Sequence, residues 1–161
     1  MKKTVNDKIP NETVYILGNQ GPEAIALSDH CAGKKVVIFA LPGAYTPTCH
    51  SAHVPSFIAS KDELAAKGID EIICLSVNDP FVMGAWGRET GATDAGILMA
   101  GDALGAFTKE MGMNFDAPPA GLMGRSNRYA MVVNDGVIEI LQEDAPGACA
   151  MSTGNGILDA L

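Results

Sequence analysis

The stretch from Lys35 to Cys49 constrains the fold more than any other part of the sequence. It contains the apolar run Val36–Leu41, which is typical of a buried β-strand. A Pro-Gly turn follows, and Thr46-Pro47 then favours the start of a helix, because threonine is a good N-cap and proline fits the first helical position. The sequence therefore predicts a strand, a tight turn and a helix whose third residue is Cys49.

This position of Cys49 favours a thiolate, although small core packing is the alternative for a lone cysteine. At a helix N-terminus, free N–H groups and the helix dipole stabilise negative charge by about 0.3–2 kcal/mol. Lowering the pKa of a thiol by about 2.5 units takes about 3.4 kcal/mol, so the helix alone is insufficient. We expect the Thr46 hydroxyl to cap the helix and donate to the sulfur, and an arginine elsewhere in the chain to supply positive charge.

Three blocks of sequence resemble the type II peroxiredoxins, the group of the redoxin (AhpC/TSA-like) superfamily that includes atypical two-cysteine and glutaredoxin-dependent enzymes. The first block has the spacing Pro-x-x-x-Thr-x-x-Cys from Pro42 to Cys49 and continues to Pro55. The second and third blocks are Ser76–Trp86 and Arg128–Gly136. The similarity extends over most of the chain.

The resemblance implies a thiol peroxidase with a thioredoxin-like α/β fold, in which a mixed central sheet carries helices on both faces. Cys49 takes the place of the peroxidatic cysteine, and Thr46 matches the hydroxyl residue that holds the peroxide. Pro42 matches the proline that shields the thiolate. Arg128 matches the arginine that activates the sulfur and polarises the peroxide. Arg125 and Arg88 are the rival cations.

The expected reaction is attack of the Cys49 thiolate on a hydroperoxide, which leaves a sulfenic acid. The first choice of reductant is glutathione with glutaredoxin, and the second is thioredoxin acting on a Cys49–Cys149 disulfide. Cys149 lies where atypical two-cysteine relatives carry their resolving cysteine, but its surroundings look more like relatives that have none. We expect neither a metal nor an organic cofactor, and the resemblance implies a homodimer.

Other readings of these residues stay open. A thioredoxin-like thiol–disulfide exchanger is disfavoured because no CxxC pair is present, and a redox sensor without peroxidase turnover is the remaining alternative. Zinc binding by Cys49, His50 and His53 is disfavoured because structural zinc sites need four ligands. We expect His53 to bond to backbone or near the site, and His50 to point to solvent. Cys74 is expected in the core, and Cys31 has no evident role.

Composition limits the class of protein. A chain of 161 residues predicts one domain, residues 1–161. The net charge of −8 argues against nucleic-acid binding, which requires a basic surface. The N-terminus lacks the apolar region of a signal peptide, and no run of about 18 apolar residues predicts a membrane span. Four cysteines without a disulfide-scaffold pattern predict a reducing, cytoplasmic environment.

The remaining pattern predicts strands and helices that alternate early, followed by a late hairpin. Expected strands are Val14–Leu17, Val36–Leu41, Glu71–Val77, Ile97–Ala100, and the hairpin Tyr129–Val133 with Val137–Leu141 around Asn134-Asp135-Gly136. Expected helices are a short turn at Ser28–His30, Pro47–Lys67 with a kink at Pro55, a helix starting at Pro80 after an Asp79 cap, Ala103–Met111 and Ser152–Leu161. Met113–Asn127 is expected to be a long functional or mobile loop.

Overall fold

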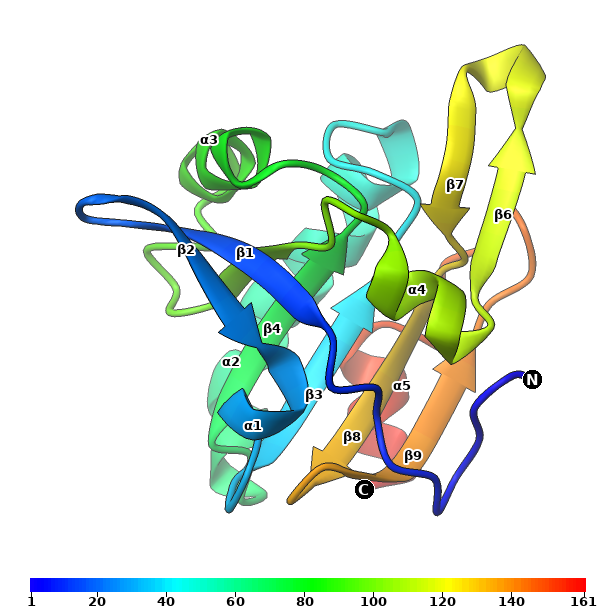
Figure 1. Ribbon diagram of the computed structural model, residues 1–161. Helices are drawn as coiled ribbons and strands as arrows, with labels where there is room; N and C mark the ends of the chain where they lie inside the picture. Colours follow the sequence, from blue (N-terminus) through cyan, green and yellow to red (C-terminus); the bar gives the residue numbers. More distant parts are fainter.

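A seven-stranded mixed sheet organises the computed structural model, which describes residues 1–161 (Figure 1). Its strand order is β2-β1-β5-β4-β3-β8-β9, and β3 runs parallel to β4 but antiparallel to β8. The strands are β1 (Thr13–Gly18), β2 (Gly21–Ala26), β3 (Lys35–Ala40), β4 (Glu71–Ser76), β5 (Leu98–Gly101), β8 (Tyr129–Asn134) and β9 (Val137–Glu143). This is the predicted α/β architecture.

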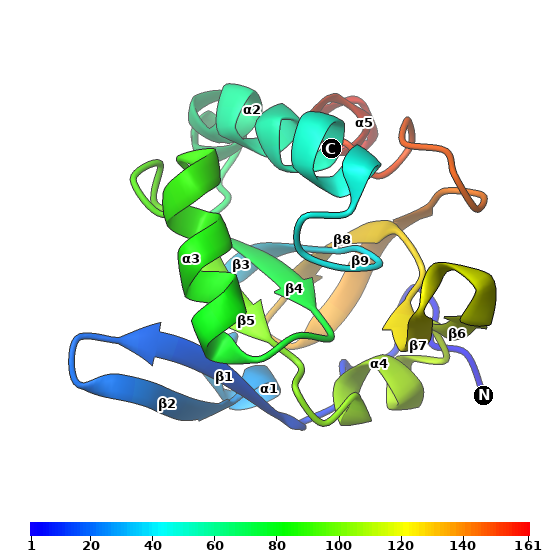
Figure 2. The same ribbon diagram turned by 90° about the horizontal axis from the view of Figure 1, so that it is seen from above.

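The side chains of β3 alternate between two hydrophobic clusters, one on each face of the sheet. Val37 and Phe39 pack in a cluster with residues of α2, α3 and α5, whereas Val36 and Ile38 pack in a cluster with residues of α1 and α4. Figure 2 shows α2, α3 and α5 over one face of the sheet. The helices are α1 (Leu27–His30), α2 (Val54–Ala66), α3 (Pro80–Thr90), α4 (Ala106–Met111) and α5 (Gly154–Ala160). Because β3 is buried on both faces, it reads as a continuous apolar run in the sequence.

The helix that carries Cys49 begins at Pro47, as predicted, but its next turn is a π-helix, Cys49–His53, which leads into α2. The backbone N–H of Val54 bonds to the carbonyl of Cys49, five residues earlier. Pro55 lacks an N–H, so the normal ladder is interrupted at this place. The predicted disturbance at Pro55 therefore takes the form of a π-helical turn.

Several local predictions agree with the structure. The Asp79 carboxylate accepts a hydrogen bond from the Val82 N–H at 2.8 Å and caps α3. The β8–β9 hairpin turns through Asp135 and Gly136, whose φ angles of 49° and 82° fit a two-residue hairpin turn. Helix α2 ends next to Gly68, which has a φ of 92°.

Other expectations were wrong. Residues 113–127 are not an irregular loop: they contain the hairpin of β6 (Asn114–Ala117) and β7 (Leu122–Ser126), joined by a 3₁₀ turn at Pro118–Ala120. Strand β2 was missed because its Gly-Pro-Glu start is atypical of strands, and it is held by backbone pairing with β1. Helix α4 is shorter than predicted, because Gly105, with a φ of 70°, precedes it in the left-handed region.

No helix in the structure combines the length and apolar character that a membrane crossing requires.

Candidate active site

The sheet register brings Cys49 and Arg128 together. Strand β3 ends beside the start of β8, where Ala40 pairs with Tyr129. Arg128 directly precedes Tyr129, and Cys49 lies in the first turns of the helix that follows β3. The Arg128 Nη2 atom donates a hydrogen bond to Cys49 Sγ at 3.1 Å, although the two residues are 79 positions apart. Cys49 is packed in the core, with 0% of its surface exposed, and also carries this bond.

Arg128 is the cation at the sulfur, and its rivals lie elsewhere. Its side chain is only 7% exposed and makes no ion pair with a carboxylate. Arg125 instead donates from Nη1 to the carbonyl oxygen of Pro42 at 3.1 Å, and Arg88 lies exposed on α3. The full positive charge of Arg128 is therefore available to stabilise a thiolate at Cys49.

His53 holds the other end of the guanidinium. Arg128 Nη1 donates to His53 Nδ1 at 2.9 Å, and His53 Nε2 donates to the Ser152 carbonyl oxygen at 2.8 Å. Burial lowers the pKa of His53 to about 4, and the Arg128 charge lowers it further against the opposing effect of the Ser152 bond. His53 is thus neutral, with its proton on Nε2. Both expected partners of His53, a backbone group and the site itself, are present.

Asp144 holds in place the segment that contains Ser152, the hydrogen-bond partner of His53. Its carboxylate accepts the backbone N–H groups of Ala150, Met151 and Ser152 and the hydroxyl of Ser152, at distances of 2.6–3.0 Å. Partial burial raises the pKa of Asp144, but the Ser152 hydroxyl and the three backbone bonds outweigh it and hold the pKa below its usual value. Neither Asp144 nor Ser152 was predicted to belong to the site, because no local sequence pattern links either residue to Cys49.

Thr46 has a different partner from the one predicted. Its hydroxyl donates to the carbonyl oxygen of Gly43 at 2.7 Å, so its only proton is not available to Cys49 Sγ. The hydroxyl also does not cap the helix, and the backbone N–H of Cys49 has no hydrogen-bond partner. The oxygen lone pairs of Thr46 and the N–H of Cys49 are consequently free to meet a bound molecule.

Side chains from two neighbouring elements hold the loop that contains Pro42. Asn78 accepts the Ala44 N–H at 3.0 Å and the Ser76 hydroxyl at 2.7 Å through its Oδ1 atom. The bond from Arg125 to the Pro42 carbonyl holds the other side. A side chain at Gly43 would place a Cβ atom 2.4 Å from Arg125 Nη1, so this contact favours glycine. The second block of the family pattern and strand β7, which lies just before the third block, thus flank the active-site loop.

His50 is not directed freely to solvent, contrary to the prediction. Its Nδ1 atom accepts a hydrogen bond from Trp86 Nε1 at 2.9 Å, and its ring stacks near Tyr45 at a centroid distance of 5.9 Å. Tyr45 has a φ of 67°, a left-handed conformation that is uncommon for a bulky residue. This aromatic group attaches the outer side of the Cys49 turn to α3.

The remaining cysteines differ from Cys49 in their surroundings. Cys74 is buried in the core as predicted, and burial raises its pKa. Burial also raises the pKa of Cys31 to about 11. Cys149 is half-buried in the loop before α5, and burial raises its pKa against the opposing charge of Arg128. The structure contains no group of three or more His, Cys, Asp or Glu side chains arranged to hold a metal ion.

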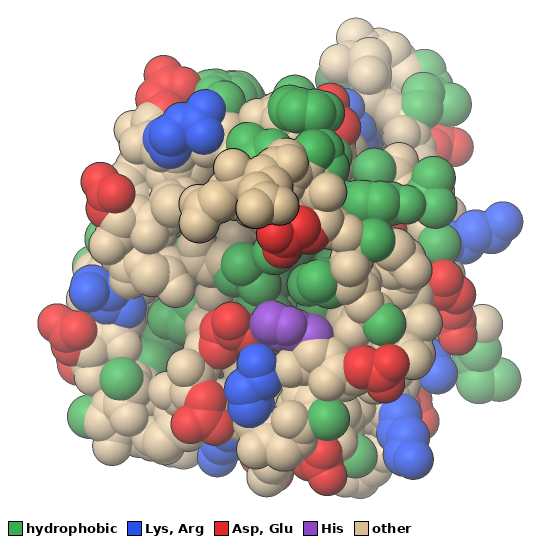
Figure 3. Space-filling view, turned by 60° about the vertical axis from the view of Figure 1, so that its left-hand side comes forward, with side chains coloured by type: hydrophobic (Ala, Val, Ile, Leu, Met, Phe, Trp, Pro, Cys, Tyr) green, Lys and Arg blue, Asp and Glu red, His purple; other side chains and the backbone are tan.

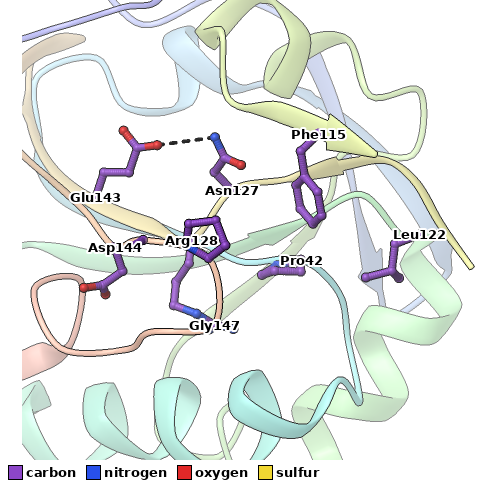
Figure 4. Close-up of a pocket in the computed structure, with 10 residues that line it drawn as sticks. Pro42, Phe115, Leu122, Asn127, Arg128, Glu143, Asp144 and Gly147 are labelled. Atoms are coloured by element: carbon purple, nitrogen blue, oxygen red, sulfur yellow. Dashed lines mark hydrogen bonds between the residues drawn. The ribbon is translucent and has the colours of Figure 1, made fainter. Parts of the chain in front are cut away.

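A pocket of about 280 Å³ adjoins Arg128. In Figure 4, Pro42, Phe115 and Leu122 line one side of it, and Glu143 and Asp144 line the other. The Asn127 amide donates to Glu143 at 3.3 Å in its wall. The Arg128 side of the site therefore borders a pocket that has both apolar and polar walls.

We expect His53 to make the stability of the protein depend on pH. An unfolded histidine titrates near 6.5, whereas the folded-state pKa of His53 is about 4. Between these values the unfolded chain binds the proton and the folded chain does not, so stability falls as the pH is lowered from 6.5 to 4, by up to about 3 kcal/mol. Urea unfolding across this range should show a shallower decline for His53→Asn. An identical decline in both proteins would contradict the assignment.

Comparison with known proteins agrees with this geometry. The sequence model of the Redoxin family matches residues 4–148. Peroxiredoxin-2C of Arabidopsis thaliana is 40% identical over 98% of this chain and 98% of its own length. Peroxiredoxin-2E, chloroplastic, of Arabidopsis thaliana is 42% identical over 98% of this chain and 69% of its own length. The crystal structure of reduced Prx3 in complex with H₂O₂ from Vibrio vulnificus has 42% identity and a TM-score of 0.93, covering 98% of each chain. The chain therefore belongs to the type II peroxiredoxins of the redoxin family.

Proposed function

We propose that this protein is a thiol-dependent peroxidase that reduces hydrogen peroxide and alkyl hydroperoxides at Cys49. The hydrogen bond from Arg128 Nη2 to Cys49 Sγ carries the proposal, because it joins a buried sulfur to a cation without a carboxylate partner. Such a cation stabilises the thiolate, which is the nucleophilic form of cysteine. The pocket that Pro42 and Arg128 line offers room for an organic substituent on the Arg128 side of the site.

In the reaction, the Cys49 thiolate attacks the terminal oxygen of the hydroperoxide. An S–O bond forms as the O–O bond breaks, so the sulfur is oxidised to a sulfenic acid. The transferred oxygen keeps its hydrogen, and the departing oxygen takes a proton from solvent and leaves as water or an alcohol. The free N–H of Cys49 and the Arg128 guanidinium donate to the oxygens as charge develops, and Thr46 accepts the peroxide O–H. Pro42 covers the thiolate from the loop.

Glutathione with glutaredoxin is our proposed reductant, in a reducing, cytoplasmic compartment. In the alternative, Cys149 forms a disulfide with Cys49 that thioredoxin reduces. The Asp144 bonds to Ala150, Met151 and Ser152 support the first route, because they hold the chain directly after Cys149 in place. A Cys49–Cys149 disulfide that displaced this segment would break these bonds.

We also propose that two copies of the chain form a homodimer at the edge of the sheet that carries the active site. Strands β3, β4 and β5 are parallel neighbours, so the segments after their carboxyl ends meet at one edge. These segments expose Tyr45, Phe81 and Leu104. The exposed Met123 belongs with them, because Gly124 O lies 3.9 Å from the Cβ position of Gly105. Figure 3 shows hydrophobic side chains gathering toward the upper right of one face. A cluster of this kind is typical of protein interfaces.

Replacing Cys49 with serine should reduce hydroperoxide consumption to the uncatalysed rate, because serine lacks an ionisable sulfur. Consumption should be followed with glutathione and glutaredoxin, and separately with thioredoxin and its reductase. Cys74→Ser is the matched control and should retain turnover. With Cys149→Ser, loss of turnover only in the thioredoxin assay would identify Cys149 as the resolving cysteine. Full activity of Cys49→Ser would refute the function, and oxidation of Cys49 without turnover would favour a redox sensor.

Replacing Arg128 with alanine should slow the alkylation of Cys49 by iodoacetamide at neutral pH by about 10- to 100-fold, since a hydrogen bond to a charged group contributes about 1.5–3 kcal/mol. Arg88→Ala removes an equal charge from the surface and should leave the rate within about two-fold. The rate should be measured with the other cysteines blocked or replaced. Equal rates in wild type and Arg128→Ala would remove Arg128 from the proposed role.

Replacing Leu104 with arginine should convert a dimer into a monomer in analytical ultracentrifugation, because a charge would then be buried at the interface. Val5→Arg places the same charge on an exposed apolar residue outside this edge and should leave the dimer intact. A wild-type protein that sediments as a monomer at micromolar concentration would contradict the proposed dimer.

A further inference from the structure

We propose that His53 is a positioning residue of the peroxidase reaction: its Nδ1 atom accepts a hydrogen bond from Arg128 Nη1 and thereby aims Nη2 at Cys49 Sγ. The proposal rests on the function assigned above to Cys49. The two bonds, of 2.9 and 3.1 Å, use the two terminal nitrogens of one planar guanidinium. Fixing one nitrogen therefore fixes the direction of the other.

The imidazole ring of His53 can orient Arg128 because the position of the ring is itself fixed. It is fully buried, with its ring centroid 5.1 Å from that of Phe39 and 5.7 Å from that of Phe57. At its far side, Nε2 donates to the carbonyl oxygen of Ser152 at 2.8 Å. The position of the acceptor at Nδ1 is consequently set by packing and by a second hydrogen bond.

The neutral charge of this acceptor matters as much as its position. A carboxylate at this place would also orient Arg128, but it would neutralise the guanidinium and weaken its effect on the thiolate. A neutral imidazole accepts the hydrogen bond and leaves the positive charge for the sulfur. The Ser152 bond keeps the proton on Nε2, so the lone pair of Nδ1 faces Arg128. Burial, which lowers the pKa of His53 to about 4, keeps the ring neutral at physiological pH.

Asp144 in turn holds Ser152, which lies in the segment before α5 and accepts the hydrogen bond of His53. It holds Ser152 through the Ser152 hydroxyl at 2.6 Å and through the backbone N–H at 3.0 Å. Hydrogen bonds thus run without a break from Asp144 through Ser152 and His53 to Arg128 and the sulfur. Displacement of the Ser152 carbonyl would rotate the imidazole and turn the guanidinium away from Cys49.

A purely structural role is the competing explanation, since His53 also fills space between two phenylalanine rings. Two amide variants separate the explanations. In His53→Asn, the amide oxygen can replace the Nδ1 acceptor, whereas the link to Ser152 is lost. In His53→Gln, the amide nitrogen can reach Ser152, whereas the acceptor for Arg128 is lost. A structural role predicts similar losses in both variants.

The test is the pH profile of Cys49 alkylation, with kcat/KM for hydrogen peroxide measured in parallel. We expect His53→Gln to shift the alkylation profile to higher pH and to lower both rates at pH 7 by about 10- to 100-fold. His53→Asn should lower them by less than about five-fold. In an Arg128→Ala background, His53→Gln should have no further effect, because His53 acts through Arg128.

Three results would overturn the proposal: an unshifted alkylation profile in His53→Gln, equal losses in the two amide variants, or a full additional loss in the Arg128→Ala background. Circular dichroism and urea unfolding establish that each variant is folded. If His53→Gln does not fold, Asp144→Ala tests the series of hydrogen bonds from its far end, because it removes the acceptor that holds both the Ser152 hydroxyl and the Ser152 N–H. It should shift the same profile in the same direction, and an unchanged profile would count against the proposal. Alkylation needs no peroxide, so its outcome is independent of whether wild type turns over hydroperoxides.

Discussion

The hydrogen bond between Arg128 and the Cys49 sulfur is the interaction on which the site depends, and it is a product of sheet pairing. The antiparallel register of β3 and β8 places the end of one strand beside the start of the other. The cysteine follows the first strand by a short loop, and the arginine directly precedes the second. A shift of the register by one residue would point Arg128 to the opposite face of the sheet, because side chains alternate along a strand.

Burying an arginine without a carboxylate partner is costly unless its hydrogen-bonding groups find acceptors. Here the acceptors are a sulfur and a neutral imidazole, at 3.1 and 2.9 Å. Neither cancels the charge while the sulfur is a thiol, so the positive charge of the guanidinium remains directed at the sulfur. The site thus uses desolvation of the cation to strengthen its attraction for a thiolate. Neutral His53 belongs to this arrangement, because a second cation at that place would oppose Arg128.

The loop before Cys49 is held by side chains from other parts of the chain and not by a cap on the helix that follows it. Asn78 and Arg125 bind its backbone at Ala44 and Pro42, while the Thr46 hydroxyl turns back to Gly43. The Cys49 N–H is therefore left without a partner at the place where substrate oxygens would lie. A conventional threonine cap would have occupied this donor and lowered the capacity of the loop to bind an anionic or developing negative oxygen.

Much of the fold was predictable from short stretches of sequence. Local patterns predicted the strand β3 from its apolar run, the start of α3 from Asp79-Pro80 and the late hairpin from Asn-Asp-Gly. They succeed because hydrophobic periodicity and turn preferences act over only a few residues. The family pattern named Cys49, Thr46, Pro42 and Arg128, and the structure brings Arg128 to the sulfur. Strand β2 and the β6–β7 hairpin were missed, because they carry weak strand patterns and are held by pairing with a neighbour.

Local sequence patterns were enough to place one cysteine near the start of a helix that follows a buried strand. The groups that surround this cysteine come from distant parts of the chain and depend on how the elements pack. The His53–Ser152 bond spans 99 positions and the Trp86–His50 bond spans 36. No local propensity encodes such contacts, because they arise when separate elements pack on one face of the sheet. For the same reason, the partner of Thr46 and the orientation of His50 differed from expectation: side-chain hydrogen bonds are chosen among groups that meet only after folding.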